Sequence, residues 1–300
     1  MKTNFEVIII GGSYAGLSAA MALGRALRET LIIDSGKPCN RQTPHSHNFI
    51  TQDGEAPAVI AAKAKQQVLT YPTVAFTEGL ADTVVKTDTG FRITLKNGTE
   101  YQAKKVLFAT GIKDSMPEID GISECWGISV IHCPYCHGYE VRHQKTAIFA
   151  NGDAAYHYAV LLTQWTKELT IFTNGTPEFT TEQKEKLQQY TIEIIDTPIT
   201  ELVHDKGRLQ QIILADGTSH SFNAMYHRAN YKQHCDIPGQ LGCTINEQGF
   251  IQTDMMQKTT IAGIFAAGDC TTPMRSVSTA VAQGTMAGAA INAELCQENF

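Results

Sequence analysis

The sequence predicts an α/β fold of two Rossmann-like domains, each a three-layer ββα unit, with the second inserted into the first. Two observations support this prediction. A strand, a small-residue turn, a helix and a second strand follow one another at residues 5–34 and again at 146–173. An apolar strand that ends in glycine also occurs before the second of these units, at 106–111, and after it, at 263–268.

Turn-rich stretches mark where the chain leaves and re-enters the first domain. Met116–Gly121 contains Pro, Gly and two acidic residues, and Asp254–Thr260 leads back towards the last strand. We therefore expect a discontinuous first domain formed by residues 1–115 and 245–300, and an inserted domain formed by residues 116–244. A chain of 300 residues is long enough for two such domains.

Composition narrows the class of protein. Lys and Arg total 24 against 30 Asp and Glu, which gives a net charge of −6, and no basic stretch indicates a nucleic-acid partner. No apolar run is long enough to cross a bilayer, and the first residues lead into a strand without a signal peptide. We expect a cytoplasmic protein without membrane partners, in which eight cysteines are too few for a disulfide scaffold.

The first strand–turn–helix–strand unit has the features of a dinucleotide site. Gly11 permits a tight turn, Gly16 lets the helix pack close to the strand, and the helix N-terminus offers N–H groups to a pyrophosphate. Asp34 ends the second strand, where it can accept hydrogen bonds from a ribose. Ser13 replaces the second glycine of the pattern, and its hydroxyl can contact phosphate. The alternative is a glycine-rich turn in an unrelated α/β domain.

Two later segments indicate which dinucleotide is bound. One apolar strand is followed by Thr110 and Gly111, and another is followed by Gly268 and Asp269. Together with the first unit, these segments resemble the three FAD-binding segments of the flavoprotein oxidoreductases that bind two dinucleotides. The resemblance implies that FAD is the cofactor and that Asp269 binds the ribitol chain of the flavin.

Two further stretches are expected to line the flavin. Ser276 and Val277 open a small-residue helix that runs to about residue 295, and in the resembled family the N-terminus of this helix faces the flavin pyrimidine. Such a helix can also simply close the core. The long polar loop after the first unit is expected to bring Arg41 and Gln52 near FAD.

A CxxC pair, Cys133 and Cys136, stands between the two dinucleotide patterns and has His132 and His137 on either side. Two cysteines at this spacing can close a disulfide, and one thiolate can expel the other from a mixed disulfide. The same spacing supplies half of a zinc site, but no second CxxC or HxxxH follows. Redox chemistry is the favoured interpretation, and zinc binding and an inert buried pair are the alternatives.

The second strand–turn–helix–strand unit has a degraded dinucleotide pattern. Its turn keeps Gly152 but has Ala150 and Ala155 at the outer glycine positions, and its helix is expected over residues 156–166. Residues 173–177, after its second strand, contain neither the basic side chains that bind the 2′-phosphate of NADPH nor the acid that binds the ribose of NADH. The sequence therefore disfavours NADPH and leaves NADH open, so that NAD(P)H is not assigned as a cofactor.

The FAD segments, the inserted unit and the CxxC pair directly before that unit resemble the low-molecular-weight thioredoxin reductase family along nearly the whole chain. Trp126–Gly127 before the pair and His137–Glu140 after it are more similar to a subgroup, the flavin dithiol oxidases that close disulfides in natural products such as gliotoxin and the depsipeptides. Thioredoxin reductases proper have Asp after the second cysteine and a basic cluster in the NADP unit. This chain has His137 in place of that aspartate and lacks the basic cluster.

The resemblance implies a role for each residue of the motif. It implies that Cys136 faces the flavin and reacts with it, that Cys133 exchanges with the sulfur of the substrate, and that His137 donates and accepts protons. The alternative for His137 is a histidine that only caps the local turn, and His132 is expected to pack or to support its neighbours. The family also implies a homodimer.

We therefore predict an FAD-dependent thiol–disulfide oxidoreductase that exchanges two electrons between a substrate, the Cys133/Cys136 pair and FAD. In the favoured direction a small-molecule dithiol or a thioredoxin-like protein is oxidised, and an acceptor such as oxygen reoxidises the flavin. The first alternative is an NAD(P)H-dependent thioredoxin-disulfide reductase that works in the opposite direction. The second alternative is a flavin-binding redox sensor without turnover.

Overall fold

A computed structural model describes residues 2–300, and the chain forms two compact units. The first unit contains the chain up to Arg41 together with Pro57–Lys113 and Tyr231–Phe300. The second contains Gln42–Ala56 and Asp114–Asn230. The chain passes from one unit to the other in strands that pair with each other, β7 (Ile112–Ser115) and β16 (Asn230–Gln233).

These units follow the packing of the chain, whereas the expected domains follow its motifs. Gln42–Ala56 lies in the expected first domain but groups with the second unit, and the Gln42 side chain there donates a 3.1 Å hydrogen bond to the Ser123 carbonyl. The chain re-enters the first unit at Tyr231, ahead of the expected residue 245. The reason is that β16 already pairs with β7, so the crossing is complete before the loop that follows.

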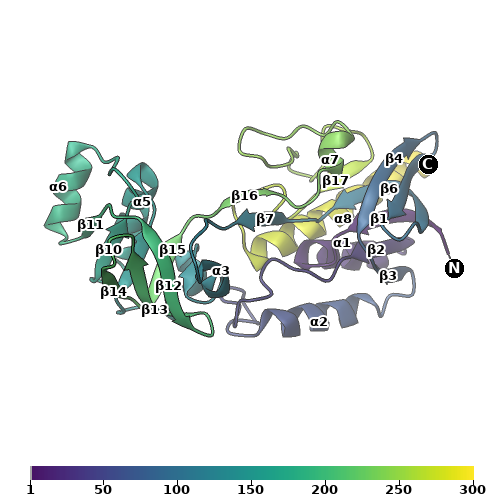
Figure 1. Ribbon diagram of the computed structural model, residues 1–300. Helices are drawn as coiled ribbons and strands as arrows, with labels where there is room; N and C mark the ends of the chain where they lie inside the picture. Colours follow the sequence, from purple (N-terminus) through teal and green to yellow (C-terminus); the bar gives the residue numbers. More distant parts are fainter. Residues whose placement is uncertain (1) are drawn as a thin grey trace. The chain divides into compact units, whose positions relative to one another are not determined.

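A seven-stranded sheet organises the first unit (Figure 1). Its strand order is β3-β2-β1-β6-β5-β4, and β17 also pairs with β6. The strands joined by parallel pairs are β1 (Asn4–Ile10), β2 (Thr30–Asp34), β3 (Val74–Glu78), β6 (Glu100–Phe108) and β17 (Ile264–Ala266). The strands β4 (Ala81–Thr87) and β5 (Gly90–Leu95) form a hairpin that is antiparallel to the first half of β6.

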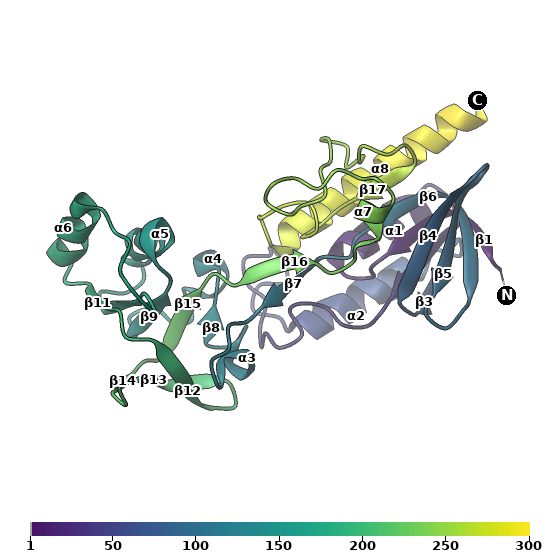
Figure 2. The same cartoon turned by 45° about the horizontal axis from the view of Figure 1, so that its top comes forward.

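Four helices belong to this unit, and two of them cross closely. They are α1 (Tyr14–Arg25), α2 (Pro57–Val68), α7 (Ile237–Gln240) and α8 (Val277–Asn299). Figure 2 shows α8 beside α1, and the Ser18 hydroxyl donates a 2.8 Å hydrogen bond to the Val281 carbonyl. Among residues 2–300, no helix combines the length and the apolar character that crossing a membrane requires.

Burial on both faces explains why the second half of β1 is apolar. Ile8 and Ile10 belong to a core that includes residues of the β4–β5 hairpin. Ile9 points to the other face, where its side chain lies close to Gly16 of α1. A parallel strand covered on both sides reads as a continuous apolar run, as this one does.

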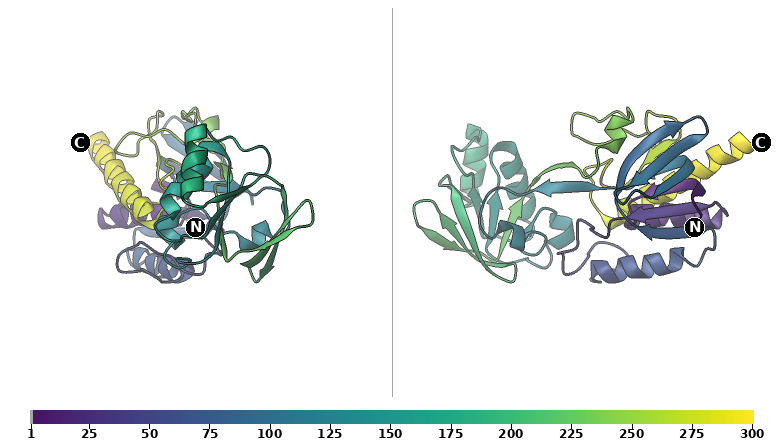
Figure 3. Two further views of the ribbon diagram at one scale, coloured as in Figure 1. Left: turned by 90° about the vertical axis from the view of Figure 1, so that its left-hand side faces the viewer. Right: turned by 45° about the vertical axis from the view of Figure 1, so that its right-hand side comes forward.

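The second unit has three layers. A five-stranded parallel sheet with the order β11-β10-β9-β15-β8 forms the middle layer. Its strands are β8 (Val130–Ile131), β9 (Thr146–Phe149), β10 (Leu169–Phe172), β11 (Glu193–Ile195) and β15 (Ala224–His227). The outer layers are the antiparallel strands β12 (Ile199–Asp205), β13 (Arg208–Leu214) and β14 (Ser219–Ser221), drawn in green in Figure 3, and the helices α5 (Gly152–Leu162) and α6 (Thr181–Gln189). Two short helices, α3 (Ile122–Cys125) and α4 (Pro134–His137), complete the unit.

Alternation along β9 separates the two cores of this unit. Ala147 and Phe149 pack in a cluster with residues of β12 and β13. Ile148 packs in a different cluster, with residues of α5 and α6. Successive strand residues point to opposite faces, so the middle sheet is covered by strands on one side and by helices on the other.

The structure confirms the predicted α/β fold with two Rossmann-like units. The helix expected at 156–166 is Gly152–Leu162 instead, because the Asn151 side chain accepts a hydrogen bond from Gly152 N and caps the helix there. The helix expected from residue 276 to about 295 begins as predicted and continues to Asn299.

Replacing Gly284 by Ala is expected to destabilise the first unit, because the added Cβ would lie 2.1 Å from the Ala15 carbonyl oxygen and force α8 away from α1. Overpacking of this kind lowers the free energy of unfolding by about 1–3 kcal/mol, which urea unfolding measures. Gly239→Ala in α7 is the matched control, since no heavy atom lies within 4 Å of its added Cβ. Equal stability of the two variants would contradict the close crossing.

Candidate functional site

The turn between β1 and α1 requires glycine at two positions. Gly11 has a φ of +110°, and a Cβ there would lie 2.2 Å from the Ala109 carbonyl oxygen. A Cβ on Gly16 would lie 1.9 Å from the Gly11 carbonyl oxygen. The first turn of α1 is therefore held directly against the end of β1, as a dinucleotide-binding turn requires.

The N-terminus of α1 is not capped by its own residues. Ser13 is the N-cap residue, and its side chain makes no capping hydrogen bond. Asp34 braces the turn from β2, since its carboxylate accepts hydrogen bonds from Gly12 N at 2.8 Å and Gly36 N at 2.6 Å. An uncapped helix N-terminus at a glycine turn presents N–H groups to a phosphate.

A buried hydroxyl beside this turn also fits a bound cofactor. Within residues 2–300, Thr110 Oγ1 is buried and has no hydrogen-bond partner. It lies just after β6, next to Gly111, which has a φ of +66°. A buried hydroxyl without a partner costs free energy unless a ligand supplies one. The glycine turn, the uncapped helix and this hydroxyl fit the predicted FAD.

The C-terminal segment contributes the other predicted flavin residues. Gly268 N donates a 2.7 Å hydrogen bond to Gln283 Oε1 of α8, which sequence reasoning did not single out. Asp269 Oδ2 lies 3.6 Å from Arg275 Nε and 4.0 Å from Cys39 Sγ. Asp269 is thus held in place by charge and by neighbouring loop residues.

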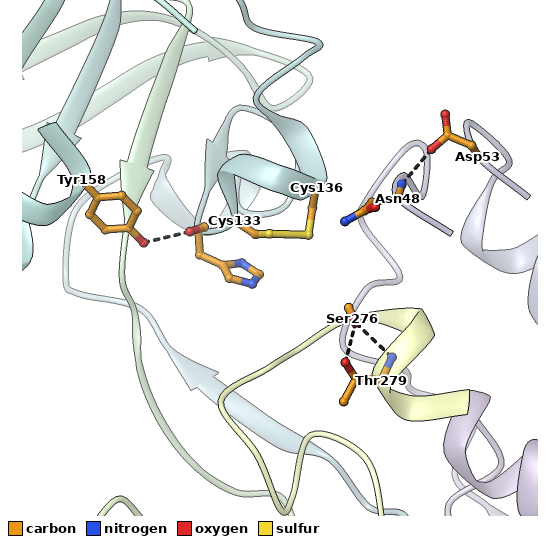
Figure 4. The surroundings of a disulfide bond; sticks show 8 residues. Asn48, Asp53, Cys133, Cys136, Tyr158, Ser276 and Thr279 are labelled. Atoms are coloured by element: carbon orange, nitrogen blue, oxygen red, sulfur yellow. Dashed lines mark hydrogen bonds between the residues drawn. A yellow bond between two sulfur atoms is a disulfide. The ribbon is translucent and has the colours of Figure 1, made fainter. Parts of the chain in front are cut away.

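The predicted residues at the start of α8 form its first turn. Val277 is the first residue of the helix. Ser276 is its N-cap, and its hydroxyl accepts a hydrogen bond from Thr279 N at 3.1 Å (Figure 4). This end of α8 is therefore satisfied by its own serine, in contrast to α1.

The loop after β2 places its two predicted flavin residues in different units. Arg41 ends the first segment of the first unit, and its guanidinium donates to the Pro38 carbonyl at 3.2 Å. Gln52 belongs to Gln42–Ala56, which packs with the second unit. A role of both residues at the flavin stays a prediction.

The CxxC pair lies at the start of α4. Cys133 is the N-cap of this helix and forms a disulfide with Cys136, with a Cα–Cα distance of 5.3 Å (Figure 4). Pro134 occupies the first helical turn, where its missing N–H and fixed φ suit a helix start. Both cysteines are half-buried, so neither residue is enclosed in the core, as exchange with a substrate thiol requires.

The backbone before the pair is fixed by aromatic neighbours. The Tyr158 hydroxyl of α5 donates a 2.8 Å hydrogen bond to the His132 carbonyl. The His132 ring stacks on Trp126 at a centroid distance of 5.8 Å. His132 therefore packs beside the pair and anchors its position.

His137 ends α4 and is surrounded by titratable groups of the same unit. Burial lowers the pKa of His137 below its ordinary value, the Glu140 carboxylate acts to raise it, and His47 acts to lower it. His47 Nε2 lies 3.5 Å from Glu140 Oε1, and His47 Nδ1 lies 3.7 Å from Asp53 Oδ1. Glu140, His47 and Asp53 were not among the predicted site residues.

The segment that supplies His47 also reaches the disulfide. In Figure 4 the Asn48 side chain points toward Cys136, and Asn48 N donates a 2.7 Å hydrogen bond to Asp53 Oδ1. The segment lies far from the pair in sequence, and its polar residues read locally as a loop. Sequence spacing therefore gave no signal that this segment belongs to the site.

Asn151 ties the loop after β10 to the start of α5 in the second βαβ unit. Asn151 Oδ1 accepts hydrogen bonds from Gly152 N at 2.8 Å and from Glu178 N at 2.9 Å. Its Nδ2 donates a 2.9 Å hydrogen bond to the Thr176 carbonyl. The loop after β10 is thereby folded onto the N-terminus of α5, where the pyrophosphate of a dinucleotide lies in this fold.

Two carboxylates also lie at this end of α5. The Glu178 side chain lies beside Gly152, with Oε2 at 3.8 Å from the place of an added Cβ. Asp153 lies in the first turn of α5, and its carboxylate accepts a 2.8 Å hydrogen bond from Gln183 of α6. Negative charge at this helix end opposes an anionic ligand.

The geometry of the described side chains also bears on metal binding. Among residues 2–300 there is no group of three or more His, Cys, Asp or Glu side chains placed to hold a metal ion. Burial raises the pKa of the Cys270 thiol to about 12, so that this neighbour of Asp269 stays protonated.

Comparisons with known proteins point to one family. A family model of pyridine nucleotide-disulphide oxidoreductases matches residues 5–284. Thioredoxin reductase sirT of Leptosphaeria maculans is 31% identical to this chain, over 96% of this chain and 93% of its own. A solved oxidoreductase structure from Agrobacterium tumefaciens is 39% identical with a TM-score of 0.91 and 99% coverage of both chains. A putative thioredoxin reductase TrxB from Bacillus anthracis is 32% identical with a TM-score of 0.94, over 99% of this chain and all of its own.

Replacing Thr110 by Val tests the flavin site, because it removes the unpartnered hydroxyl with little change in shape. We expect apo-protein stability to stay equal or rise, and FAD affinity to fall about 3- to 10-fold for one lost hydrogen bond. Urea unfolding and flavin titration measure the two effects. Thr30→Val is the matched control, since Thr30 Oγ1 already donates to the Arg28 carbonyl and its loss should lower stability and leave FAD affinity unchanged.

Proposed function

The chain belongs to the pyridine nucleotide-disulphide oxidoreductase family and is an FAD-dependent thiol–disulfide oxidoreductase, and on this basis we propose that it works as a dithiol oxidase. In this function a substrate dithiol reduces the Cys133/Cys136 disulfide, and the electrons leave through FAD to an acceptor such as molecular oxygen. The predicted resemblance to the thioredoxin reductases is confirmed by relatives that carry that name.

The loop that Asn151 ties to the start of α5 is the observation that supports this direction. A nicotinamide-dependent reductase receives its electrons from a dinucleotide bound at that end of the helix. In this chain the Asn151 side chain accepts a hydrogen bond from Gly152 N there, and Glu178 and Asp153 place negative charge beside it. Electrons that do not enter from a nicotinamide have to enter from the thiol substrate.

The cysteine pair can oxidise a dithiol in two exchange steps. A substrate thiolate attacks Cys133 Sγ, the Cys133–Cys136 bond breaks, and Cys136 leaves as a thiolate. The second substrate thiolate then attacks the mixed disulfide, which releases the oxidised substrate and leaves Cys133 reduced. Two electrons and no atoms pass from the substrate to the pair, and two protons are released. FAD, when bound, accepts the two electrons and passes them to the acceptor.

His137 is the proposed base for the released protons. Its imidazole follows Cys136 directly, and burial lowers its pKa, so that the neutral form predominates at neutral pH. A neutral imidazole can take the proton of a substrate thiol and make the attacking thiolate.

We further propose a small-molecule dithiol or a thioredoxin-like protein as the substrate, a homodimer, and a reducing cytoplasmic compartment. Tyr135 and Tyr139, which are 64% and 65% exposed, give the face beside the pair aromatic surface for an apolar dithiol. Within residues 2–300, six of the eight cysteines form no disulfide, which fits a reducing compartment. Light scattering on the purified protein tests the dimer.

Anaerobic mixing of the purified holoprotein with dithiothreitol, NADH or NADPH tests the direction of electron flow. We expect the dithiol to bleach the flavin absorbance and both nicotinamides to leave it unchanged within the same time. Cys136→Ser should slow thiol-driven bleaching by at least about 10³-fold, because the pair acts as a unit. Oxygen consumption with excess dithiol then reports turnover.

Cys296→Ser is the control for this experiment, since Cys296 is an exposed free thiol at the end of α8 and should leave the bleaching rate unchanged. Rapid bleaching by NADPH would overturn the proposal in favour of a nicotinamide-dependent reductase. Bleaching by dithiol without turnover in air would instead favour a redox sensor.

A further inference from the structure

Three stretches of the second unit bring charged groups together at His137. His137 ends α4, Glu140 follows on the next turn, and His47 comes from the distant segment Gln42–Ala56. His47 stands between two carboxylates, with Nε2 at 3.5 Å from Glu140 Oε1 and Nδ1 at 3.7 Å from Asp53 Oδ1. This arrangement holds the His47 ring between the two carboxylates, and His137 lines the same pocket as His47 and Glu140.

We propose that His47 and Glu140 are positioning residues that set the proton affinity of His137, an inference that rests on the proposed role of His137 in thiol oxidation. Glu140 brings negative charge that favours the imidazolium form of His137. His47, when it carries a proton, brings positive charge that disfavours it. The two residues therefore act on His137 in opposite directions.

His137 lines a pocket through which a proton can pass to water. His137, His47 and Glu140 line one pocket of about 310 Å³ in the second unit. The other ionisable groups that face it are His45, from the segment of His47, and Arg208 of β13. Gln144 adds a neutral polar wall. A pocket of this volume and polarity can hold water that takes up a proton.

The proton balance of the reaction gives this pocket a role. Each substrate dithiol releases two protons when it becomes a disulfide, and the cysteine thiolates of the pair and the reduced acceptor take up protons in turn. A proton that His137 takes from one substrate thiol has to pass to one of these groups or to water before His137 accepts another. The strength with which it holds that proton is the quantity that His47 and Glu140 set.

The pH dependence of thiol-driven flavin bleaching tests the inference. The rate should fall at low pH as His137 becomes protonated, with an acid midpoint that follows the pKa of His137. Glu140→Gln should move this midpoint down and His47→Asn should move it up, each by about half a unit to one unit. Comparing all variants with the same dithiol removes the contribution of the substrate's own ionisation.

Histidine NMR gives a readout that does not depend on flavin chemistry. In protein labelled at the histidine Cε1 position, His137→Gln identifies the His137 signal by its loss. The titration midpoint of that signal should move down in Glu140→Gln and up in His47→Asn. Glu140→Asp, which keeps the charge, should restore most of the wild-type midpoint in both measurements.

Two exposed residues serve as matched controls, Glu185→Gln on α6 and His234→Asn in the first unit, and neither should move a midpoint. Midpoints that stay unchanged in Glu140→Gln and His47→Asn, or that move in the same direction, would overturn the inference. If dithiol fails to bleach the flavin of the wild type, the proposed function fails, and the NMR titration still decides whether these residues control His137.

Discussion

The hydrogen bonds of one asparagine side chain set the second Rossmann-like unit apart from the first. Asn151 accepts hydrogen bonds from Gly152 N and Glu178 N and donates one to the Thr176 carbonyl, so that the loop after β10 and the start of α5 satisfy each other. At the corresponding position of the first unit, the Ser13 side chain makes no capping hydrogen bond. The same βαβ turn thus has an uncapped helix N-terminus in the first unit, which can receive a phosphate, and an asparagine-capped helix N-terminus in the second. The proposed direction of electron flow depends on this difference.

The dithiol site combines a fixed backbone segment with a partly exposed cysteine pair. The backbone before the pair is held by Tyr158 and by the stacking of His132 on Trp126. The pair itself lies on a helix of only one turn, where Cys133 and Cys136 are half-buried. A disulfide that must exchange with a substrate needs accessible sulfurs, but its reacting atoms also need a defined position. Because only the segment before the pair is fixed, the reacting atoms have a defined position and the two cysteines are not enclosed in the core.

Local patterns in the sequence were sufficient to predict the fold and the centre of the site. The βαβ elements were predictable because apolar runs and small-residue turns are short-range signals, and the CxxC spacing is one as well. The start of α5 was placed too late, because capping by Asn151 outweighed the apolar pattern that begins at Tyr156. The approach of His47 and Glu140 was not predictable, because it depends on a distant loop that packs with the inserted unit. No residue spacing encodes such a contact.

Two independent features of the second unit agree on the chemistry. In the proposed function the thiol substrate is the source of electrons, and oxidation of a thiol needs a base that is unprotonated when the substrate arrives. The His137 imidazole can act as this base, because burial lowers its pKa and so favours the neutral form. Burial weakens the imidazole as a base, and the Glu140 carboxylate opposes this effect. An aspartate in the place of His137 would be charged at neutral pH and far less basic, so a histidine there suits an enzyme that takes protons from its substrate.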